Sequence, residues 1–418
     1  MTVGVVGAGI TGLSASYYFE QADLDHVVFE EADRPGGVIR TSHVNGRVLE
    51  CGPQRGRMSP TLRAIIDEAG AADEVIEADG DMPLYVYADG KLREVPFDVK
   101  TFLTTDLLSW PGKLRVLAEP LTADGDEDEI AADLFSRKFG EEAYRNFIGP
   151  IFGGTYGSDP GEMYAKYALS RILEFEKRKG SLLVPAIKRA TSESRAPAFS
   201  FRDGMARLPE AMYDLQREHV RLETPVEAIT EDGDGYVLAT PDGDHEVTDV
   251  VLTTPADVTA DLVRDIDPES AAALDSLNYN SMVLVHLDAD VDADGMGYQI
   301  RHDEPYKTLG VTWHDSLFDR TGVYTVFLGG MKNPDLIRES DEELGRIAQE
   351  EFADVMGVAS DVINVERLER GFPAYDRSWT ATEDVDLPDG LHIAANFTTG
   401  AGIPTRIHEA KGLADRLG

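Results

Sequence analysis

The stretch Val3-Gly-Val-Val-Gly-Ala-Gly-Ile-Thr-Gly12 decides the fold of this 418-residue chain. Its first four residues are a short, mostly apolar run of the kind that parallel sheets bury. Residues 13–21 then have the composition of a helix, and a second apolar run at residues 26–29 ends in an acid, Glu30. A strand, G-x-G-x-x-G, a helix, a strand and an acid form the complete context of a dinucleotide-binding fingerprint.

The three glycines of this fingerprint have distinct physical roles. Gly7 allows the tight turn, Gly9 lets the backbone approach a pyrophosphate, and Gly12 permits close packing of the helix on the strand. The pyrophosphate then lies at the N-terminus of the helix, where unpaired backbone N–H groups favour an anion. The loop residues that we expect to contact the nucleotide are Gly7, Ala8, Gly9, Thr11 and Gly12.

The acid at the end of the second strand completes the fingerprint. Glu30 lies 18 residues beyond Gly12 and is placed to bind a ribose hydroxyl. Glu31 is the neighbouring alternative, but the alternation of side chains along the strand favours Glu30.

The next segment, Ala32-Asp-Arg-Pro-Gly-Gly-Val-Ile-Arg-Thr41, bears on which nucleotide is bound. A second glycine pair so soon after the ribose acid is unusual for simple NAD dehydrogenases. The segment resembles the extended E-A-x-x-R-x-G-G-R-x-x-T signature of FAD enzymes in the amine oxidase and protoporphyrinogen oxidase superfamily. Gly36 and Gly37 permit close approach to the ribose and pyrophosphate, while Arg34 and Arg40 offer positive charge. A surface turn followed by a strand is the structural alternative.

The composition is strongly acidic, with 77 Asp and Glu against 39 Lys and Arg and a formal net charge of −38. Nucleic acid is therefore an unexpected partner, because phosphate binding needs a basic surface. An anionic membrane would also be repelled by most of this surface, although a local basic or apolar patch can still dock. Dense charge is screened at high salt, so we expect a halophilic-type surface, with an acidic mesophilic protein as the alternative.

Other classes of site and location are disfavoured. Cys51 is the one cysteine, which excludes an intramolecular disulfide and fits a reducing cytoplasm. No run approaches the roughly 18 apolar residues of a membrane span, and no signal peptide is recognisable. The nine histidines show no metal-ligand spacing, so we predict no metal. We expect a cytoplasmic protein, with peripheral contact at the inner face of the membrane as the alternative.

The rest of the chain alternates between strand-like and helix-like blocks. Residues 81–98 are expected to form a hairpin that turns at Ala88-Asp-Gly90, and residues 101–190 to be mainly helical. A β-α-β beginning and a β-loop-α end predict an α/β fold whose doubly wound nucleotide domain is discontinuous. The other expected strands are 226–229, 235–238, 247–254, 282–287, 324–328 and 391–397, and the expected helices include 110–117, 130–139, 141–147, 341–356 and 405–417.

Nearly end to end, the chain resembles the oxygen-dependent protoporphyrinogen oxidase family, which includes coproporphyrinogen-oxidising relatives. Asp203 and Ala395 replace glycines of the family pattern, and the C-terminal motif is the most family-specific. Besides the two N-terminal glycine motifs, the resemblance is carried by Leu49-Glu-Cys-Gly-Pro53, Gly154-Thr-Tyr-Gly-Ser-Asp159, Phe201-Arg-Asp-Gly-Met-Ala-Arg-Leu208, Thr308-Leu-Gly-Val-Thr-Trp-His-Asp-Ser-Leu-Phe318 and Gly390-Leu-His-Ile-Ala-Ala-Asn396 with its continuation to Pro404.

The resemblance implies a Rossmann-like FAD-binding domain in three segments, 1–80, 195–260 and 365–418. It implies two inserted domains. Residues 81–194 would form a mainly helical domain, which the family uses for substrate entry and membrane contact, and residues 261–364 a mixed α+β substrate domain. FAD would be bound without a covalent bond.

The resemblance also assigns further cofactor contacts. The backbone of Val226 would meet the adenine, Thr254 would face the isoalloxazine ring, and Gly52-Pro53 would pass the flavin. The C-terminal strand would join the sheet that Val3 begins, and the helix after it would direct its N-terminus at the flavin. The residues expected at the flavin in this loop are Asn396, Gly400, Gly402, Ile403 and Pro404, with a plain turn residue as the alternative for Asn396.

The implied reaction is the oxidation of a porphyrinogen by hydride transfer to flavin N5, with oxygen or another acceptor reoxidising the flavin. Such a substrate is an apolar disk edged with carboxylates, so its site should be apolar with a few cations. Lys100, Arg93 and Arg301 are candidates for these cations, each with a solvated surface cation as the alternative. His314 is the best-placed histidine, with a structural histidine as the alternative, and no general base stands out.

Three other functions stay open at this point. Coproporphyrinogen III carries four carboxylates and would need more cations around it than protoporphyrinogen IX. A carotenoid desaturase or an amine oxidase would share the FAD fold, and a non-catalytic flavin-binding protein would belong to a different class. The sequence does not determine the electron acceptor or the oligomeric state.

Overall fold

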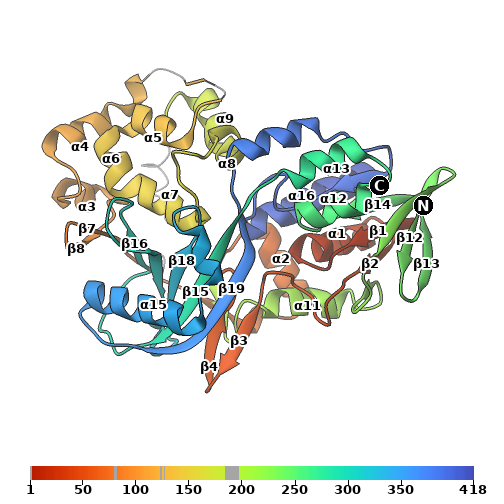
Figure 1. Ribbon diagram of the computed structural model, residues 1–418, viewed down its shortest axis with the longest axis horizontal. Coiled ribbons are helices and arrows are strands. Elements are labelled where there is room, and N and C mark those ends of the chain that lie inside the picture. The colour runs from red at the N-terminus through yellow and green to blue at the C-terminus, as the bar shows by residue number, and fades with distance from the viewer. Residues whose placement is uncertain (1, 80–81, 123–124, 127, 184–196) are drawn as a thin grey trace.

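The structure is a computed structural model that describes residues 2–79, 82–122, 125–126, 128–183 and 197–418 (Figure 1). Among the described residues, no helix is both long and apolar enough to cross a membrane.

A five-stranded parallel sheet lies at the centre of the nucleotide-binding part, in the order β10-β2-β1-β14-β20. Every neighbouring pair in it is parallel. Strands from three distant parts of the chain therefore form one sheet, which confirms the predicted discontinuous Rossmann-like fold. The strands are β1 (Thr2–Val6), β2 (Asp25–Phe29), β10 (Val220–Arg221), β14 (Asp249–Leu252) and β20 (Leu391–Ile393).

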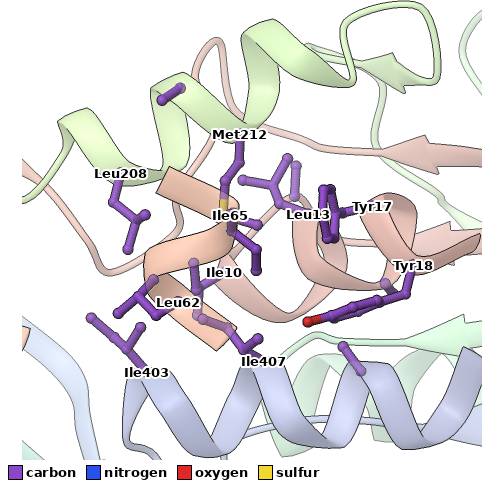
Figure 2. Close-up of a cluster of buried hydrophobic side chains, with 14 of the residues drawn as sticks. Ile10, Leu13, Tyr17, Tyr18, Leu62, Ile65, Leu208, Met212, Ile403 and Ile407 are labelled. Atoms are coloured by element: carbon purple, nitrogen blue, oxygen red, sulfur yellow. The ribbon is translucent and has the colours of Figure 1, made fainter. Parts of the chain in front are cut away.

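Helices cover one face of this sheet. α1 (Ile10–Gln21) and α16 (Ile403–Leu417) lie side by side there and share one apolar core with α2 (Pro60–Glu68) and α11 (Arg207–Leu215). Figure 2 shows Ile10, Leu13, Ile65 and Ile407 interleaved between these helices. The first and last helices of the chain are thus packed on each other.

The other face of the sheet is covered by two helices and a small antiparallel sheet. α12 (Ala256–Val263) and α13 (Pro268–Asp275) share a core with Val6, Val250 and Leu252. The three-stranded sheet comprises β11 (Ala228–Asp232), β12 (Gly235–Thr240) and β13 (Gly243–Val247). The nucleotide-binding part therefore has three layers.

A second, seven-stranded sheet has the order β19-β15-β18-β17-β16-β7-β8. α15 (Asp341–Met356) packs on one face of it through Leu344, Ile347 and Phe352. The hairpin predicted at residues 81–98 is confirmed, but it is bonded into this sheet although it precedes the helical region. The strands are β7 (Leu84–Ala88), β8 (Lys91–Glu94), β15 (Tyr279–Asp288), β16 (Gly297–Ile300), β17 (Thr308–Trp313), β18 (Val323–Gly329) and β19 (Asp361–Pro373).

The region between the hairpin and residue 183 is mainly helical, as expected, and forms a separate lobe (Figure 1). One predicted helix, 141–147, changes to π-helix over Tyr144–Ile148, just before Gly149-Pro150. The α-helices of this lobe are α3 (Val99–Thr104), α4 (Trp110–Leu117), α5 (Ala131–Phe139), α6 (Glu141–Ala143), α7 (Gly149–Tyr156), α8 (Ala165–Ala168) and α9 (Ser170–Lys179).

Three shorter sets of elements connect these parts. β3 (Thr41–Val44) pairs with β4 (Arg47–Glu50), and β5 (Gly56–Arg57) and β6 (Val75–Glu77) both pair with β9 (Ala198–Phe201). Of the short helices, α14 is His314–Phe318 and the 3-10 turns are Ala72–Glu74, Glu119–Leu121, Pro334–Arg338 and Arg377–Asp384.

Several predicted boundaries were wrong, for identifiable reasons. The strand expected at 391–397 ends at Ile393, because its partner β14 ends opposite it at Leu252. The strand expected at 247–254 is two strands, since Val247 pairs in the small sheet while residues 249–252 enter the parallel sheet. The last helix begins at Ile403 rather than Thr405, because Pro404 is tolerated in a first turn.

Candidate functional site

The first glycine loop follows β1 at the carboxyl edge of the parallel sheet, where such folds bind their ligands. Gly7 has φ +100°, and its N–H donates to the Phe29 carbonyl at 2.7 Å. A Cβ on Gly12 would lie 1.9 Å from the Gly7 oxygen, so only glycine lets α1 pack this close to the turn. Gly7 and Gly12 therefore shape the loop through contacts within the protein.

Gly9 differs from its neighbours because the space beside it is open. A Cβ built on Gly9 would meet no atom within 4 Å, and one on Gly37 would meet only the Gly9 Cα, at 3.6 Å. Gly36, whose N–H donates to the Ala8 carbonyl at 2.9 Å, brings the second glycine pair against the first. The two glycine motifs thus border an open space at the start of α1, which fits a pyrophosphate.

Two helix N-termini reach this edge of the sheet without a capping side chain. α1 begins after Gly9 and α16 after Gly402, and neither N-cap residue bonds the first turn through a side chain. By contrast, Ser59 caps α2 and Ser340 caps α15. Uncapped N–H groups carry partial positive charge, so both glycine-started helices suit an electron-rich ligand.

Glu30 lies at the end of β2, as predicted, and is buried. One carboxylate oxygen accepts the Ala8 N–H at 2.7 Å and the other accepts the Ala32 N–H at 3.0 Å. These bonds fix the acid between the two glycine motifs, where the ribose of a dinucleotide is expected.

The two arginines after Glu30 have different surroundings. Arg34 donates to the Gly37 carbonyl at 3.0 Å, and burial is the main cause that lowers the pKa of its guanidinium. Arg40 is ion-paired with Glu366 of β19, so its charge is neutralised within the protein. Gly52 packs against Val38, where a Cβ would lie 1.9 Å from the carbonyl oxygen.

The C-terminal loop is tied down by a buried arginine. Arg406 of α16 is only 2% exposed; it donates to the Ala395 carbonyl and Thr399 hydroxyl and pairs with Glu409. Gly400 has φ +115°, which only glycine adopts without strain. The loop is therefore held from the helix that follows it.

Asn396 is placed by a residue from the other sheet. Its Oδ1 accepts the Tyr279 hydroxyl at 3.0 Å, and that hydroxyl accepts the Ala256 N–H at 3.2 Å. These two hydrogen bonds connect the segments that follow β14 and β20, at the edge where the flavin ring is expected.

The remaining predicted cofactor residues lie around the same edge or next to its strands. Thr254 follows β14 and its hydroxyl lies 2.8 Å from that of Thr259. Val226 is half-buried in the connection between β10 and β11, outside the strand predicted for it. Ile403 and Pro404 form the first turn of α16, as expected.

Of the cations predicted for the substrate, Arg301 and Arg93 both lie close enough to Asp89 to lower the pKa of its carboxyl, Arg301 mainly through a hydrogen bond and Arg93 through its charge. Lys100 is exposed on α3, and Arg93 pairs with Asp106. Arg301 is buried but contacts three carboxylates, those of Asp89, Asp303 and Glu304. A role in substrate binding stays a prediction for each of them.

His314 is fully enclosed. Its Nε2 lies 2.8 Å from the Gln54 Oε1 and 3.1 Å from the Thr325 hydroxyl, and burial keeps the pKa of its imidazole well below the usual value. A neutral, enclosed ring agrees with the structural alternative for this histidine.

The seven-stranded sheet presents an apolar face on the side away from α15. β15 alternates, so Val283 and Val285 face α15 while Met282 and Leu284 point to the opposite side. Phe327, Leu368 and Phe372 are half-buried beside them, and Tyr156 at the end of α7 lies edge-on to Phe372. The ion pair of Arg40 with Glu366 connects this face to the second glycine motif.

Glu50 lies in one of the motifs that carry the resemblance, but the sequence assigned it no supporting role. Glu50 is completely buried and accepts from Arg320 at 2.8 Å, from Thr41 at 2.8 Å and from the Met205 N–H at 3.1 Å. These partners are up to 270 residues apart in the chain, so only the folded structure brings them together.

The structure also places Glu20, His26 and His219 together at the opposite edge of the sheet, beside a cavity of about 360 Å³. The two rings are stacked, with centroids 4.2 Å apart, and both His26 nitrogens already face partners, Ser16 and the Leu24 carbonyl. A ligating imidazole holds a metal near its own plane, so two stacked rings are poorly arranged to share one ion. The absence of a metal stays a prediction.

A larger cavity, of about 710 Å³, lies outside the C-terminal loop. It is bordered by Phe397, Gly400, Tyr375 and Trp379, and by Lys166 of α8. It adjoins the loop on the side of the edge strand β20, away from the glycine motifs.

Comparison with known proteins adds an independent observation. Residues 10–410 match the family described as flavin containing amine oxidoreductase. The chain is 24% identical to protoporphyrinogen oxidase 2 of Arabidopsis thaliana, over 99% of this chain and 93% of the relative. It is 28% identical to a coproporphyrinogen III oxidase of Staphylococcus aureus, over 90% and 88% of the two chains.

Solved structures share the fold. A candidate protoporphyrinogen oxidase from an Exiguobacterium species superposes with a TM-score of 0.82 at 24% identity, over 100% of this chain and 98% of that one. A putrescine oxidase variant gives 0.76 at 17% identity, over 100% and 99%.

Proposed function

Because the chain belongs to the flavin containing amine oxidoreductase family and is an FAD-dependent oxidoreductase, we propose that it oxidises a porphyrinogen, protoporphyrinogen IX, to the porphyrin. Relatives bearing the names protoporphyrinogen oxidase and coproporphyrinogen III oxidase support the substrate class. The more specific assignment rests on the apolar face of the seven-stranded sheet.

One observation favours the substrate with fewer carboxylates. The sheet face of Leu284, Phe327, Leu368 and Phe372 is apolar and partly aromatic, which suits a flat macrocycle. The cations predicted to serve this substrate are exposed or neutralised, as Arg301 is by three carboxylates. Protoporphyrinogen IX has two carboxylates, whereas coproporphyrinogen III has four and would need more cations.

The residues described above would hold FAD as follows. Gly9 and Gly37 would leave room for the pyrophosphate, Glu30 would bind the ribose, and the uncapped start of α16 would stabilise the electron-rich end of the ring. When bound, FAD supplies the two-electron acceptor for the substrate. Tyr279 orients Asn396 at this edge, and burial raises the pKa of Tyr279 to about 12, so it remains a neutral hydrogen-bonding group.

Anaerobic flavin reduction tests this proposal directly. The purified holoenzyme would be mixed with protoporphyrinogen IX, coproporphyrinogen III, a carotenoid precursor or a primary amine, and its flavin absorbance followed. We expect the fastest loss of absorbance with protoporphyrinogen IX. Faster reduction by coproporphyrinogen III would reverse the substrate assignment, and reduction by the amine or the carotenoid alone would refute porphyrinogen oxidation.

An apolar patch on the helical lobe supports peripheral membrane contact, which we include in the proposal. Trp110 is 69% exposed, Leu114 is 66% exposed, and both lie on one side of α4 with Leu117. Leu121, just beyond α4, is 88% exposed. α3 and α4 lie at the end of the molecule far from both termini (Figure 1). Large apolar side chains gathered on so acidic a protein fit a surface that meets lipid.

Vesicle flotation would test the patch. We expect the protein to float with vesicles and the double variant Trp110→Ser, Leu114→Ser to lose most of this binding while reducing its flavin normally. Equal flotation of the variant and the parent protein would rule out this patch as the contact surface.

A further inference from the structure

Arg55 is a cation that no described residue neutralises. It lies between the Gly52-Pro53 turn and β5, and its side chain is half-buried. No hydrogen bond or ion pair joins its guanidinium to any residue in the described ranges. Burial is the main cause that lowers its pKa to about 10, and Arg57 adds to the effect.

Among the described residues, Arg55 differs from the other enclosed arginines because it has no partner of any kind. Arg320 contacts Glu50 and Arg301 contacts Asp89, whereas the half-buried Arg34 and Arg115 donate to backbone carbonyls. Partly buried charges are normally paired, because desolvation without a partner is unfavourable. A ligand that brings its own negative charge would complete the site.

The residue before Arg55 is held by hydrogen bonds. Gln54 donates from Nε2 to the Gly52 carbonyl at 2.7 Å, and its Oε1 lies 2.8 Å from Nε2 of His314. The side-chain amide of Gln54, the residue before Arg55, is therefore held through both its nitrogen and its oxygen. His314 is close enough for the charge of Arg55 to help hold down the pKa of its imidazole, after burial, Arg320 and His286.

We propose that Arg55 binds a carboxylate of the substrate and so determines specificity for acidic porphyrinogens. The proposal rests on the function proposed above. A guanidinium offers two parallel N–H donors that match a carboxylate, and the Gly52-Pro53 turn before it is expected to pass the flavin. Unlike Lys100 on the surface and Arg301 among its three acids, Arg55 has both partial enclosure and an unused charge.

The test compares an acid with its ester in matched variants. Anaerobic flavin reduction would be measured against the concentration of protoporphyrinogen IX and of its dimethyl ester, in the parent protein, Arg55→Gln, Arg55→Lys and Arg57→Gln. Arg57 is the control because it lies two residues away and is exposed. We expect Arg55→Gln to weaken binding of the diacid roughly 10- to 100-fold and to leave the ester unchanged. Arg55→Lys should be intermediate, and Arg57→Gln should match the parent.

Each possible outcome of this experiment leads to a different conclusion. If the diacid reduces the flavin of the parent and of Arg55→Gln equally well, this inference is wrong and the proposed function stands. If no porphyrinogen reduces the parent, both are wrong. Loss of FAD from Arg55→Gln would assign the arginine to the cofactor instead. A lower melting temperature for this variant would indicate a structural ion pair and overturn the inference, since removing an unpaired charge should leave the melting temperature unchanged or raise it.

Discussion

Two glycine loops, residues 7–12 and residues 396–404, each lead into a helix at the edge of the parallel sheet, but different contacts hold them in place. Both start a helix whose first turn has no capping side chain, and the two helices pack on each other. The first loop is shaped by backbone contacts within a few residues, such as Gly12 against Gly7. The second is held by side chains, chiefly Arg406 and Tyr279. A loop whose shape depends on its own glycines can be predicted from the sequence. A loop held by side chains from distant parts of the chain can be recognised only in the folded structure.

Gly12→Ala should have the largest effect on stability, because the added Cβ would lie 1.9 Å from the Gly7 backbone oxygen. We expect the flavin-free protein to lose about 3 kcal/mol or more of its free energy of unfolding. The control is Gly412→Ala in α16, whose Cβ would meet only an Arg416 atom at 3.9 Å and which should be neutral or stabilising. Equal melting temperatures for the two variants would contradict the close packing of the first loop.

Arg406→Met tests how far the second loop depends on one side chain. The substitution removes a buried cation from Ala395, Thr399 and Glu409, and we expect a loss of about 3 kcal/mol in denaturant unfolding. Arg416→Met on the same helix is the control. If both variants unfold at the same denaturant concentration, the loop is not held by Arg406.

Gly9→Ala separates ligand binding from folding within the first loop. Its added Cβ would meet no protein atom within 4 Å, so the flavin-free protein should melt like the parent. The methyl group would enter the space expected for the pyrophosphate and weaken FAD binding roughly 10- to 100-fold. Fluorescence titration of the flavin-free protein would measure this. Unchanged affinity would place the pyrophosphate elsewhere.

Gly400→Ala should give the smallest effect, and it tests whether backbone conformation alone requires glycine in the C-terminal loop. Space is available, since the nearest atom to its Cβ would be the Tyr375 hydroxyl oxygen at 3.8 Å, but φ is +115°. We expect a loss of about 1 kcal/mol from backbone strain alone. Gly402→Ala, at φ −68°, should stay within about 0.5 kcal/mol of the parent. A larger loss at Gly402 than at Gly400 would contradict this assignment.

The fold was predictable where its signals are local. The G-x-G-x-x-G turn, the acid at Glu30 and the hairpin at Ala88-Asp-Gly90 each lie within a short stretch of chain, and each was found as predicted. The end of the last strand was missed because a strand ends where its partner ends, here opposite Leu252. That information lies about 140 residues away from β20 in the chain.

The candidate site likewise has features that the sequence predicts and features that only the folded structure shows. Residue type and spacing alone point to a dinucleotide and to the edge of the sheet where it binds, because pyrophosphate and ribose recognition requires glycines and an acid at fixed positions along the chain. The choice of FAD comes from the resemblance to the extended signature of flavin enzymes. The state of each cation is a matter of tertiary structure. Two of the three acids that contact Arg301, Asp303 and Glu304, are close to it in the sequence, but Asp89 is 212 residues away. Among the described residues no acid pairs with Arg55, which only the folded structure shows. Charge pairing acts through space, so only the folded chain decides which cation remains to meet a ligand.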